Sequence, residues 1–128
     1  MSMDYQIVPD KNDVITRWIC KGLNYDENWI TDHITFGFRL NEELIGGLIF
    51  HDYRPQQEIW WTVYSVDKRW CNRRMLRIMF GMAFEVFGCK RISLLVNKSN
   101  TVSLNFVKKL GFQQEGMFRA YRDNGEDC

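Results

Sequence analysis

The chain has 128 residues, of which 45% are hydrophobic, 15% aromatic and 26% charged, and its formal net charge at pH 7 is +1. This length predicts one globular domain over residues 1–128, with a core of its own and no room for a second domain. No run of about 18 apolar residues occurs, and the N-terminus lacks a basic start and an apolar core, which excludes a membrane span and a signal peptide and makes a cytoplasmic protein the expectation.

The two halves of the chain carry opposite charge. Residues 1–66 hold five basic and ten acidic side chains, whereas residues 67–128 hold twelve basic and six acidic ones. Such asymmetry indicates an anionic ligand on the basic side and a cationic one on the acidic side, or else a solvated surface with no partner.

The cysteines and histidines predict neither a metal site nor a disulfide framework. The four cysteines are widely spaced and form no Cys-x-x-Cys pair, and neither histidine has an acidic or cysteine partner at a ligand spacing. We therefore expect reduced thiols and no bound metal.

The first elements are a short strand and an amphipathic helix. Residues 5–8 are mostly apolar and precede a proline, which predicts a strand. Apolar residues then recur at helical spacing over 13–20, with Asn12 or Asp13 as the expected N-cap and Gly22 as the expected stop.

A hairpin and a third strand follow a polar segment at 24–29. Residues 34–40 alternate in polarity, a short polar turn follows, and 44–50 return as the second strand. Residues 58–66 are rich in aromatic and β-branched residues and predict a third strand. These strands should form an antiparallel meander.

The periodicity changes in the second half of the chain. Residues 75–87 are apolar on nearly every side, which predicts a long, largely buried helix, and 92–96 predict a buried strand. A helix at 100–110 and a strand at 112–118 complete the order. A strand, helix and strand after a meander imply a crossover and a locally parallel pairing. The fold class is therefore α/β (α+β), with a mixed, mostly antiparallel sheet flanked by helices.

The helix at 100–110 has clear signals at both ends. Asn100 is a good N-cap, and Gly111 followed by Phe112 is typical of a Schellman motif. One apolar stripe joins them, formed by Val102, Phe106 and Leu110. On local physics alone this is a well-terminated helix with a polar N-terminus where a small anion could dock.

The segment from Asn100 to Arg119 resembles the C-terminal motif of the GNAT N-acetyltransferases, and most closely the branch that contains the ribosomal-protein alanine acetyltransferases. The resemblance implies the GNAT fold and an acetyl-CoA-dependent transfer of an acetyl group to an amine. The residues that match in identity and spacing are Asn100, Ser103, Lys109, Leu110, Gly111, Phe112, Glu115, Gly116 and Arg119.

The resemblance also places the cofactor. In the family, an Arg/Gln-x-x-Gly-x-Gly/Ala loop before the long helix holds the pyrophosphate, and the matching segment here is 71–76, which has neither glycine. Backbone groups near 62–66 would pair with the pantetheine arm. The implied cofactor-binding residues are Val66, Cys71, Asn72, Arg73, Arg74, Met75, Asn100, Ser103, Phe106 and Lys109.

Basic residues near this loop offer compensation for the missing glycines. Five cations follow the third strand of the meander, and they either hold the phosphates or form a solvated collar around the helix. They are Lys68, Arg69, Arg73, Arg74 and Arg77.

The family chemistry needs a base for the amine and an acid for the leaving thiolate. Glu58 is the carboxylate inside the 58–66 strand and is the first candidate base, or alternatively an exposed residue at a strand edge. Glu115 is the second candidate. Val107 stands where many relatives have a tyrosine acid, so Ser103 is the candidate acid, or alternatively a hydroxyl bonded to the helix backbone.

The sequence leaves the acceptor and the assembly open. Trp29, Trp60, Trp61 and Tyr64 are expected in the core or on a sheet face, and could line a cleft for a cationic amine of a protein, peptide or small molecule. The last strand of the family fold is missing or shortened, which favours a homodimer over an open sheet edge. The alternatives are a GNAT-fold binding module without catalysis and, ranked last, a nucleic-acid-interacting protein.

Overall fold

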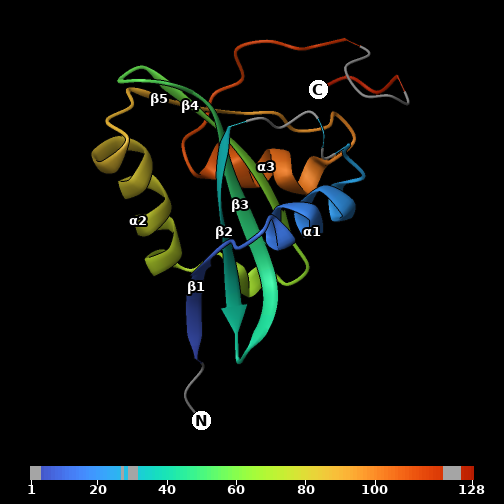
Figure 1. Cartoon of the computed structure of the whole chain (residues 1–128). Coiled ribbons are helices and arrows are strands. Elements are labelled where there is room, and N and C mark those ends of the chain that lie inside the picture. The colour runs from blue at the N-terminus through green and yellow to red at the C-terminus, as the bar shows by residue number, and fades with distance from the viewer. Residues whose placement is uncertain (1–3, 27, 29–31, 120–124) are drawn as a thin grey trace. The chain divides into compact units, whose positions relative to one another are not determined.

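The computed structural model describes residues 4–26, 28, 32–119 and 125–128 (Figure 1). The chain divides into two compact units, Met1–Ser93 and Leu94–Cys128, and each is described by itself. The aromatic residue Trp29, expected in the core, on a sheet face or lining a cleft, lies outside the described residues. No helix among the described residues is long and apolar enough to cross a membrane.

The first unit is built around a sheet whose strands follow one another in sequence order. The strands are β1 (Tyr5–Pro9), β2 (His33–Leu40), β3 (Glu43–Arg54), β4 (Glu58–Ser65) and β5 (Arg91–Leu94). The first four pair antiparallel with their neighbours, which confirms the predicted hairpin and meander.

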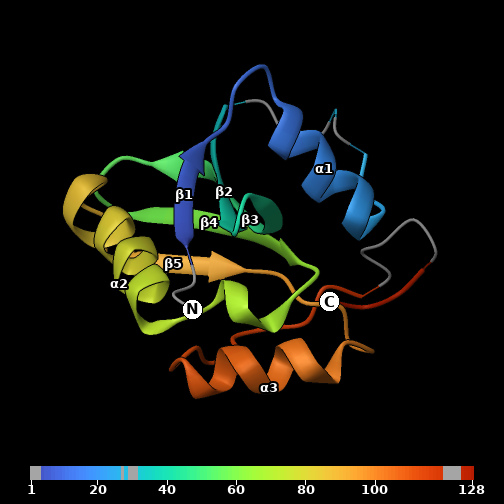
Figure 2. The same ribbon diagram turned by 90° about the horizontal axis from the view of Figure 1, so that it is seen from below.

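The connection from β4 to β5 is a crossover through α2. Figure 2 shows the arrows of β4 and β5 pointing the same way, so these two neighbouring strands are parallel. The backbone N–H groups of Lys90 and Arg91 donate to the carbonyl of Gln57 at 2.9 and 3.0 Å, so β5 begins beside the start of β4. The sheet is therefore mixed and mostly antiparallel, as predicted.

The first helix, α1 (Val14–Leu23), begins and ends differently from the prediction. Asn12 and Asp13 both have positive φ, and Asp13 makes no capping hydrogen bond. The carboxylate of Asp10 instead accepts from the N–H groups of Ile15 at 2.8 Å and Thr16 at 3.0 Å.

Gly22 lies inside α1 and does not end it. A Cβ at this position would meet the ring of Tyr64 at 2.3 Å, so the glycine allows the helix to pack closely on β4. The helix ends at Asn24, which takes a left-handed conformation with φ 58° and ψ 43°. A glycine is therefore found both where a helix ends and where a helix packs closely on a strand, and Gly22 is the second case.

The two helices of the first unit cover opposite faces of the sheet (Figure 1). On the α1 face, Ile15, Ile19 and Cys20 pack against Ile49 of β3. On the other face lies α2 (Arg73–Gly81), which continues as a π-helical turn over Met82–Val86. The buried side chains on that face include Phe38, Leu48, Phe50, Trp61, Met75 and Met79. Burial of this apolar surface is the main source of the unit's stability.

The helix predicted at 75–87 is less buried than its composition suggests. Met75, Met79 and Ala83 form the buried stripe at helical spacing, whereas Phe84 is 46% exposed and Val86 is 74% exposed. The prediction of a largely buried helix was therefore wrong on its outward face.

The second unit contains α3 (Thr101–Lys109) and the chain that follows it. The Asn100 side chain accepts from the N–H of Ser103 at 3.2 Å, which confirms the predicted cap. At the other end, Gly111 has φ 101°, the Phe112 N–H donates to the Val107 carbonyl at 3.1 Å and the Gly111 N–H donates to that of Lys108. This is the predicted Schellman motif.

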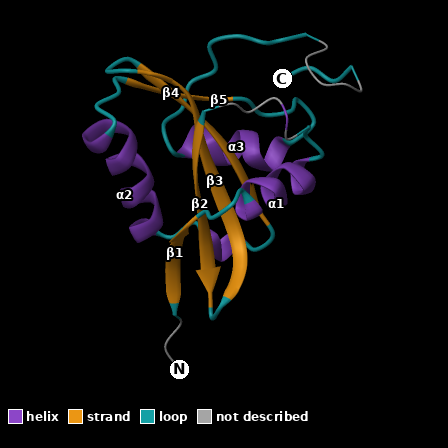
Figure 3. Ribbon diagram, viewed as in Figure 1, coloured by secondary structure: helices purple, strands orange, loops and turns teal. Residues whose placement is uncertain are grey.

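Two other expectations for this unit were wrong. Val102, placed on the apolar stripe, is 80% exposed. Residues 112–119 form no strand and are drawn as loop in Figure 3. Phe118 and Cys128 do exchange two backbone hydrogen bonds, of 2.8 and 3.0 Å, so a strand-like pairing exists without a regular ladder.

Candidate active site

The N-terminus of α2 is a capped helix end with free backbone donors. Asn72 is the N-cap, and its side-chain oxygen accepts from the N–H of Met75 at 2.9 Å. Among the described residues, the N–H groups of Arg73 and Arg74 in the first turn have no hydrogen-bond partner. Free first-turn N–H groups and the positive end of the helix dipole favour a phosphate at this place.

Cations surround this helix end, and one of the five predicted ones is already paired. Arg69 forms an ion pair with Asp67 at 2.6 Å, and this pairing lowers the pKa of Asp67 to about 2. The remaining four side chains are exposed and form no ion pair with any described residue: Lys68, Arg73, Arg74 and Arg77. They are available to a polyanion.

Arg74 and Leu76 stand where the family loop has small residues, and Cys71 stands where it has Arg or Gln. Arg74 is exposed at the helix N-terminus, and Leu76 and Cys71 are half-buried. Burial raises the pKa of the Cys71 thiol to about 11, so this thiol stays protonated at neutral pH. Met75 is fully buried and its N–H is taken by Asn72, so Met75 itself offers a ligand nothing.

The second half of β4 has an open edge. β5 begins beside Gln57 and ends at Leu94, so it runs along β4 only to about Trp61. Within the described sheet, residues Thr62–Ser65 pair with β3 on one side and have no strand on the other. We call this the open edge of β4. Its backbone groups can accept an extended, amide-containing chain as a strand would be accepted. Val66, at its end, is 60% exposed.

Glu58 lies at the opposite end of β4 and is not an exposed edge residue, because its side chain is only 14% exposed. One carboxylate oxygen accepts from the hydroxyl of Ser93 at 2.6 Å and lies 3.3 Å from Arg91, and the other faces Arg54 at 3.2 Å. The Ser93 hydrogen bond and the two arginines lower the pKa of Glu58. The carboxylate is thus ionised at neutral pH and already well supplied with donors.

The predicted residues of the second unit lie together on α3. Asn100 caps the helix with its side chain, while Phe106 is half-buried and Lys109 is exposed in the last turn. The hydroxyl of Ser103 makes no hydrogen bond to any described residue, so the alternative of a backbone-bonded hydroxyl is not seen. This hydroxyl remains free to meet a ligand.

His51 is a polar residue of the first unit whose role the sequence did not reveal. It lies in β3, its side chain is 7% exposed, and each ring nitrogen has a close partner. Nδ1 lies 2.7 Å from a carboxylate oxygen of Asp52, and Nε2 lies 2.8 Å from the hydroxyl of Thr62 on β4. Its signal in the sequence is a His-Asp pair at the end of a strand, which has no metal-ligand spacing and by itself predicts no site.

A β-bulge explains how consecutive residues can touch. In a regular strand His51 and Asp52 would point to opposite faces of the sheet. The pairing of β3 with β4 changes register between His51 and Arg54, and Asp52 has a positive φ of 49°. This bulge turns the Asp52 carboxylate back toward the imidazole.

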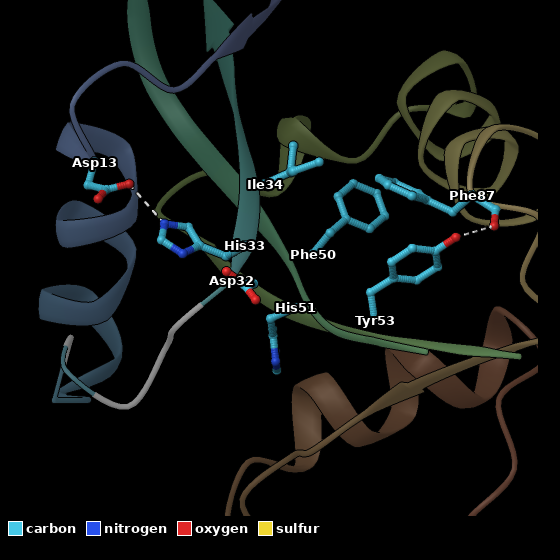
Figure 4. A pocket seen from close by; sticks show the side chains of 8 residues that line it. All are labelled: Asp13, Asp32, His33, Ile34, Phe50, His51, Tyr53 and Phe87. Atoms are coloured by element: carbon cyan, nitrogen blue, oxygen red, sulfur yellow. Dashed lines mark hydrogen bonds and ion pairs between the residues drawn. The ribbon is translucent and has the colours of Figure 1, made fainter. Parts of the chain in front are cut away.

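An open cavity of about 370 Å³ lies where β2 begins and β3 ends (Figure 4). Its acidic side carries Asp13, which bonds His33 at 2.8 Å, and Asp32, whose side chain is exposed. Its lining residues are Asp13, Asp32, His33, Ile34, Phe50, His51, Tyr53 and Phe87. Carboxylates beside aromatic rings suit a cationic ligand with an apolar part.

The other predicted aromatic residues belong mainly to the sheet packing. Trp61 is 3% exposed and contacts Phe50 and Phe80, and the Tyr64 ring packs edge-on against Trp18 of α1 at 5.1 Å. Within the part of the chain that the structure describes, no cluster of three or more potential metal ligands occurs.

The sequence and the fold were compared with known proteins. Residues 6–127 match the model of the acetyltransferase (GNAT) domain. No curated protein matches the sequence.

Several solved structures with a similar fold are acetyltransferases. A GNAT family acetyltransferase from Elizabethkingia anophelis with acetyl-CoA bound has a TM-score of 0.74 at 15% identity, over 97% of this chain and 92% of that one. Arabidopsis thaliana NAA60 in complex with acetyl-CoA has a TM-score of 0.69 at 13% identity, over 98% and 94%. The aminoglycoside N-acetyltransferase AAC(6')-Iy in complex with CoA has a TM-score of 0.68 at 15% identity, over 96% and 97%. Since the domain model spans nearly the whole sequence, the chain belongs to the acetyltransferase (GNAT) family.

Proposed function

We propose that this protein transfers the acetyl group of acetyl-CoA to a primary amine by direct attack in a ternary complex. The observation that carries the proposal is the path from the open edge of β4 to the free N–H groups of α2. The open edge, at Thr62–Ser65, is followed in the chain by Val66, a 3-10 helical turn at Lys68–Trp70 and the capped helix end at Asn72. An extended arm that ends in a pyrophosphate matches this order of groups.

The cofactor is assigned to these groups by their chemistry. The amides of the pantetheine arm would pair with the open edge of β4, and the pyrophosphate would accept from the N–H groups of Arg73 and Arg74. The exposed guanidinium groups of Arg73 and Arg74 add positive charge, which compensates for the close backbone contacts that the absent glycines would have allowed. Three solved relatives named above carry acetyl-CoA or CoA, which supports the same cofactor here.

The second unit contributes contacts by family resemblance. Asn100, Phe106 and Lys109 stay predicted contacts of CoA. Ser103 stays the predicted acid for the leaving thiolate, and its free hydroxyl supports that role. A proton delivered to the thiolate as the C–S bond breaks is the chemistry required.

Glu58 stays the predicted base, in competition with a structural role. An ionised carboxylate is what a base needs, but its lowered pKa makes it a weaker one, and Ser93, Arg91 and Arg54 occupy its oxygens. Holding β3, β4 and β5 together is the competing role. Loss of turnover without loss of stability in Glu58→Gln would favour the base.

The acceptor is an amine of a protein, a peptide or a small molecule. The named relatives do not choose among these, because one is an aminoglycoside acetyltransferase and another is NAA60. We also keep as proposals the branch of the ribosomal-protein alanine acetyltransferases, suggested by the Asn100–Arg119 motif, a homodimer, and a cytoplasmic location.

Thermal stability with acetyl-CoA tests the cofactor assignment. Millimolar acetyl-CoA should raise the Tm of the wild-type chain, because a ligand that binds only the folded state stabilises it. Arg73→Ala combined with Arg74→Ala should reduce this shift, and added salt should reduce it further. Arg39→Ala removes an exposed cation of β2 and is the matched control. An unchanged Tm in the wild type would reject the proposal.

Turnover separates the enzyme from a binding module. The wild-type chain should release CoA thiol when acetyl-CoA is supplied with an aminoglycoside or with a peptide that has a free N-terminal amine. Stabilisation by acetyl-CoA without turnover of any amine in such a panel would favour the binding module.

A further inference from the structure

The hydroxyl of Thr62 stands at the point where the open edge of β4 begins. Toward the start of β4 the strand is covered by β5, and from Thr62 onward it is not. An arm that pairs with the open edge would therefore have its acyl end beside Thr62, because its phosphate end must reach α2. Thr62 is half-buried and its hydroxyl contacts His51.

The hydrogen-bond directions in this cluster are fixed by Asp52. An ionised carboxylate only accepts, so Nδ1 of His51 must carry the hydrogen that it donates to Asp52. Nε2 is then left with its lone pair, and the Thr62 hydroxyl donates to it. The chain of donors thus runs from Thr62 to His51 and from His51 to Asp52.

We propose that Thr62, His51 and Asp52, in place of Glu58, form a proton relay that deprotonates the acceptor amine, which leaves Glu58 the structural role set by its bonds to Ser93 and Arg54. The proposal rests on the proposed function, since it assigns a role within the same acetyl transfer. Thr62 would touch the amine, His51 would act through Thr62, and Asp52 would orient the imidazole. The bulge at Asp52 is the backbone feature that makes the contact between Asp52 and His51 possible.

The transfer balances in protons and bonds. The ammonium form of the acceptor gives one proton to the Thr62 oxygen while the Thr62 proton moves to Nε2 of His51, and the Asp52 carboxylate stabilises the imidazolium. The neutral amine then attacks the thioester carbon, the new C–N bond forms, the C–S bond breaks, and the thiolate takes a proton. The nitrogen loses its second proton to solvent, and the imidazolium returns its proton the same way.

The charges around His51 support a neutral imidazole before reaction. Burial lowers its pKa, the Asp52 hydrogen bond raises it, and the neighbouring His33 lowers it. His33 is the direct partner of His51 across β2 and β3, and it faces Asp13. The exposed Asp32 and the phenol of Tyr53 line the same cavity. The imidazole is therefore neutral before reaction, with the lone pair of Nε2 directed at the Thr62 hydroxyl.

Substitution of Thr62 by a residue of similar shape tests the relay without opening a cavity in the site. Thr62→Val keeps the shape and removes the hydroxyl, and kcat/KM for the amine should fall about 10²- to 10⁴-fold, the usual contribution of a proton-transfer group. Thr62→Ser keeps a hydroxyl and should retain most of the rate. His51→Gln should lose as much as Thr62→Val, and the double variant should lose no more, because the two residues act as a unit.

The pH profile gives a readout that a structural role would not change. With the relay, kcat/KM should be level from the pKa of His51 up to that of the amine, because the enzyme accepts the ammonium form. In Thr62→Val the free amine must be captured, so kcat/KM should rise about tenfold per pH unit over the same range. Arg39→Ala, which removes an exposed cation of β2, is the control and should keep the level region.

Two measurements keep the test decisive. The ¹⁵N chemical shifts of His51 report which nitrogen carries the hydrogen, and a hydrogen on Nε2 would overturn the relay even if a variant failed to fold. A Thr62→Val protein that is folded, stabilised by acetyl-CoA and as active as the wild type would overturn it too. If the wild type is not stabilised by acetyl-CoA, the proposed function fails instead, so the two failures are distinguishable.

Discussion

Ser93 of β5 donates a hydrogen bond of 2.6 Å to Glu58 of β4, and this bond joins the two parallel neighbours at the start of β4. Replacement of Glu58 by Gln should lower the free energy of unfolding at pH 7 by about 1.5–3 kcal/mol, the usual worth of hydrogen bonds to a charged group. Urea unfolding measures it. Glu85→Gln, at an exposed position of the π-helical turn, is the control.

The same carboxylate makes stability depend on pH. The folded-state pKa of Glu58 is lowered from 4.5, so its stabilisation is present above that value and is lost as the pH falls through the folded pKa. Glu58→Gln should flatten the urea midpoint against pH below about 4.5. Equal slopes in the two proteins would show that the ion pairs contribute nothing.

Asp10 should be the capping residue that matters for α1. Asp10→Ala removes the acceptor for the N–H groups of Ile15 and Thr16 and for the Thr16 hydroxyl, and should cost about 1–2 kcal/mol. Asp13→Asn is the matched control, because Asp13 occupies the cap position without a capping hydrogen bond, and Asn tolerates the positive φ and keeps an oxygen that can accept from His33. Thermal unfolding compares the two variants, and a larger loss of stability in Asp13→Asn would contradict this assignment.

His51 should destabilise the fold in mild acid. Burial lowers its pKa below the usual 6.5, so the unfolded chain binds more protons between the folded pKa and 6.5. Stability should therefore rise with pH through this window, level off above about 6.5, and fall as the pH drops below it. His51→Gln should remove this slope in urea midpoints taken between about pH 5 and 7.5. A retained slope would assign it to another group.

Gly111 should be needed for the end of α3. Its φ of 101° strains any residue with a Cβ, so Gly111→Ala should destabilise the helix by about 1–2 kcal/mol. Gly116→Ala is the matched control, since Gly116 has no strained φ and open space around it. Helical circular dichroism during unfolding compares the two; equal losses would argue against the Schellman end.

The sequence predicted the elements whose signals are local. Alternation along β2 and β3 and the apolar run of β4 placed the meander, and Asn100 and Gly111 placed both ends of α3. The cap of α1 was missed because Asp10 reaches the helix from outside the first turn. The strand at 112–118 was predicted from its place after the glycine that ends α3, but a strand needs a partner, and the order of elements does not supply one.

The site was predictable where it depends on helix ends and not where it depends on register. Asn72 and the cations near it follow from their position before a helix. The contact of His51 with Thr62 depends on which residues face each other across β3 and β4, and its contact with Asp52 depends on a bulge. Neither contact can be predicted from the local composition of the sequence.

A protein that handles a thioester risks acylating its own thiols by exchange. Cys71 lies one residue before the cap of α2, beside the proposed cofactor path, and only a thiolate attacks a thioester efficiently. With a pKa of about 11, about one Cys71 in 10⁴ is a thiolate at pH 7. Its burial therefore protects acetyl-CoA from a side reaction that would consume the cofactor and leave a blocked side chain near its phosphates.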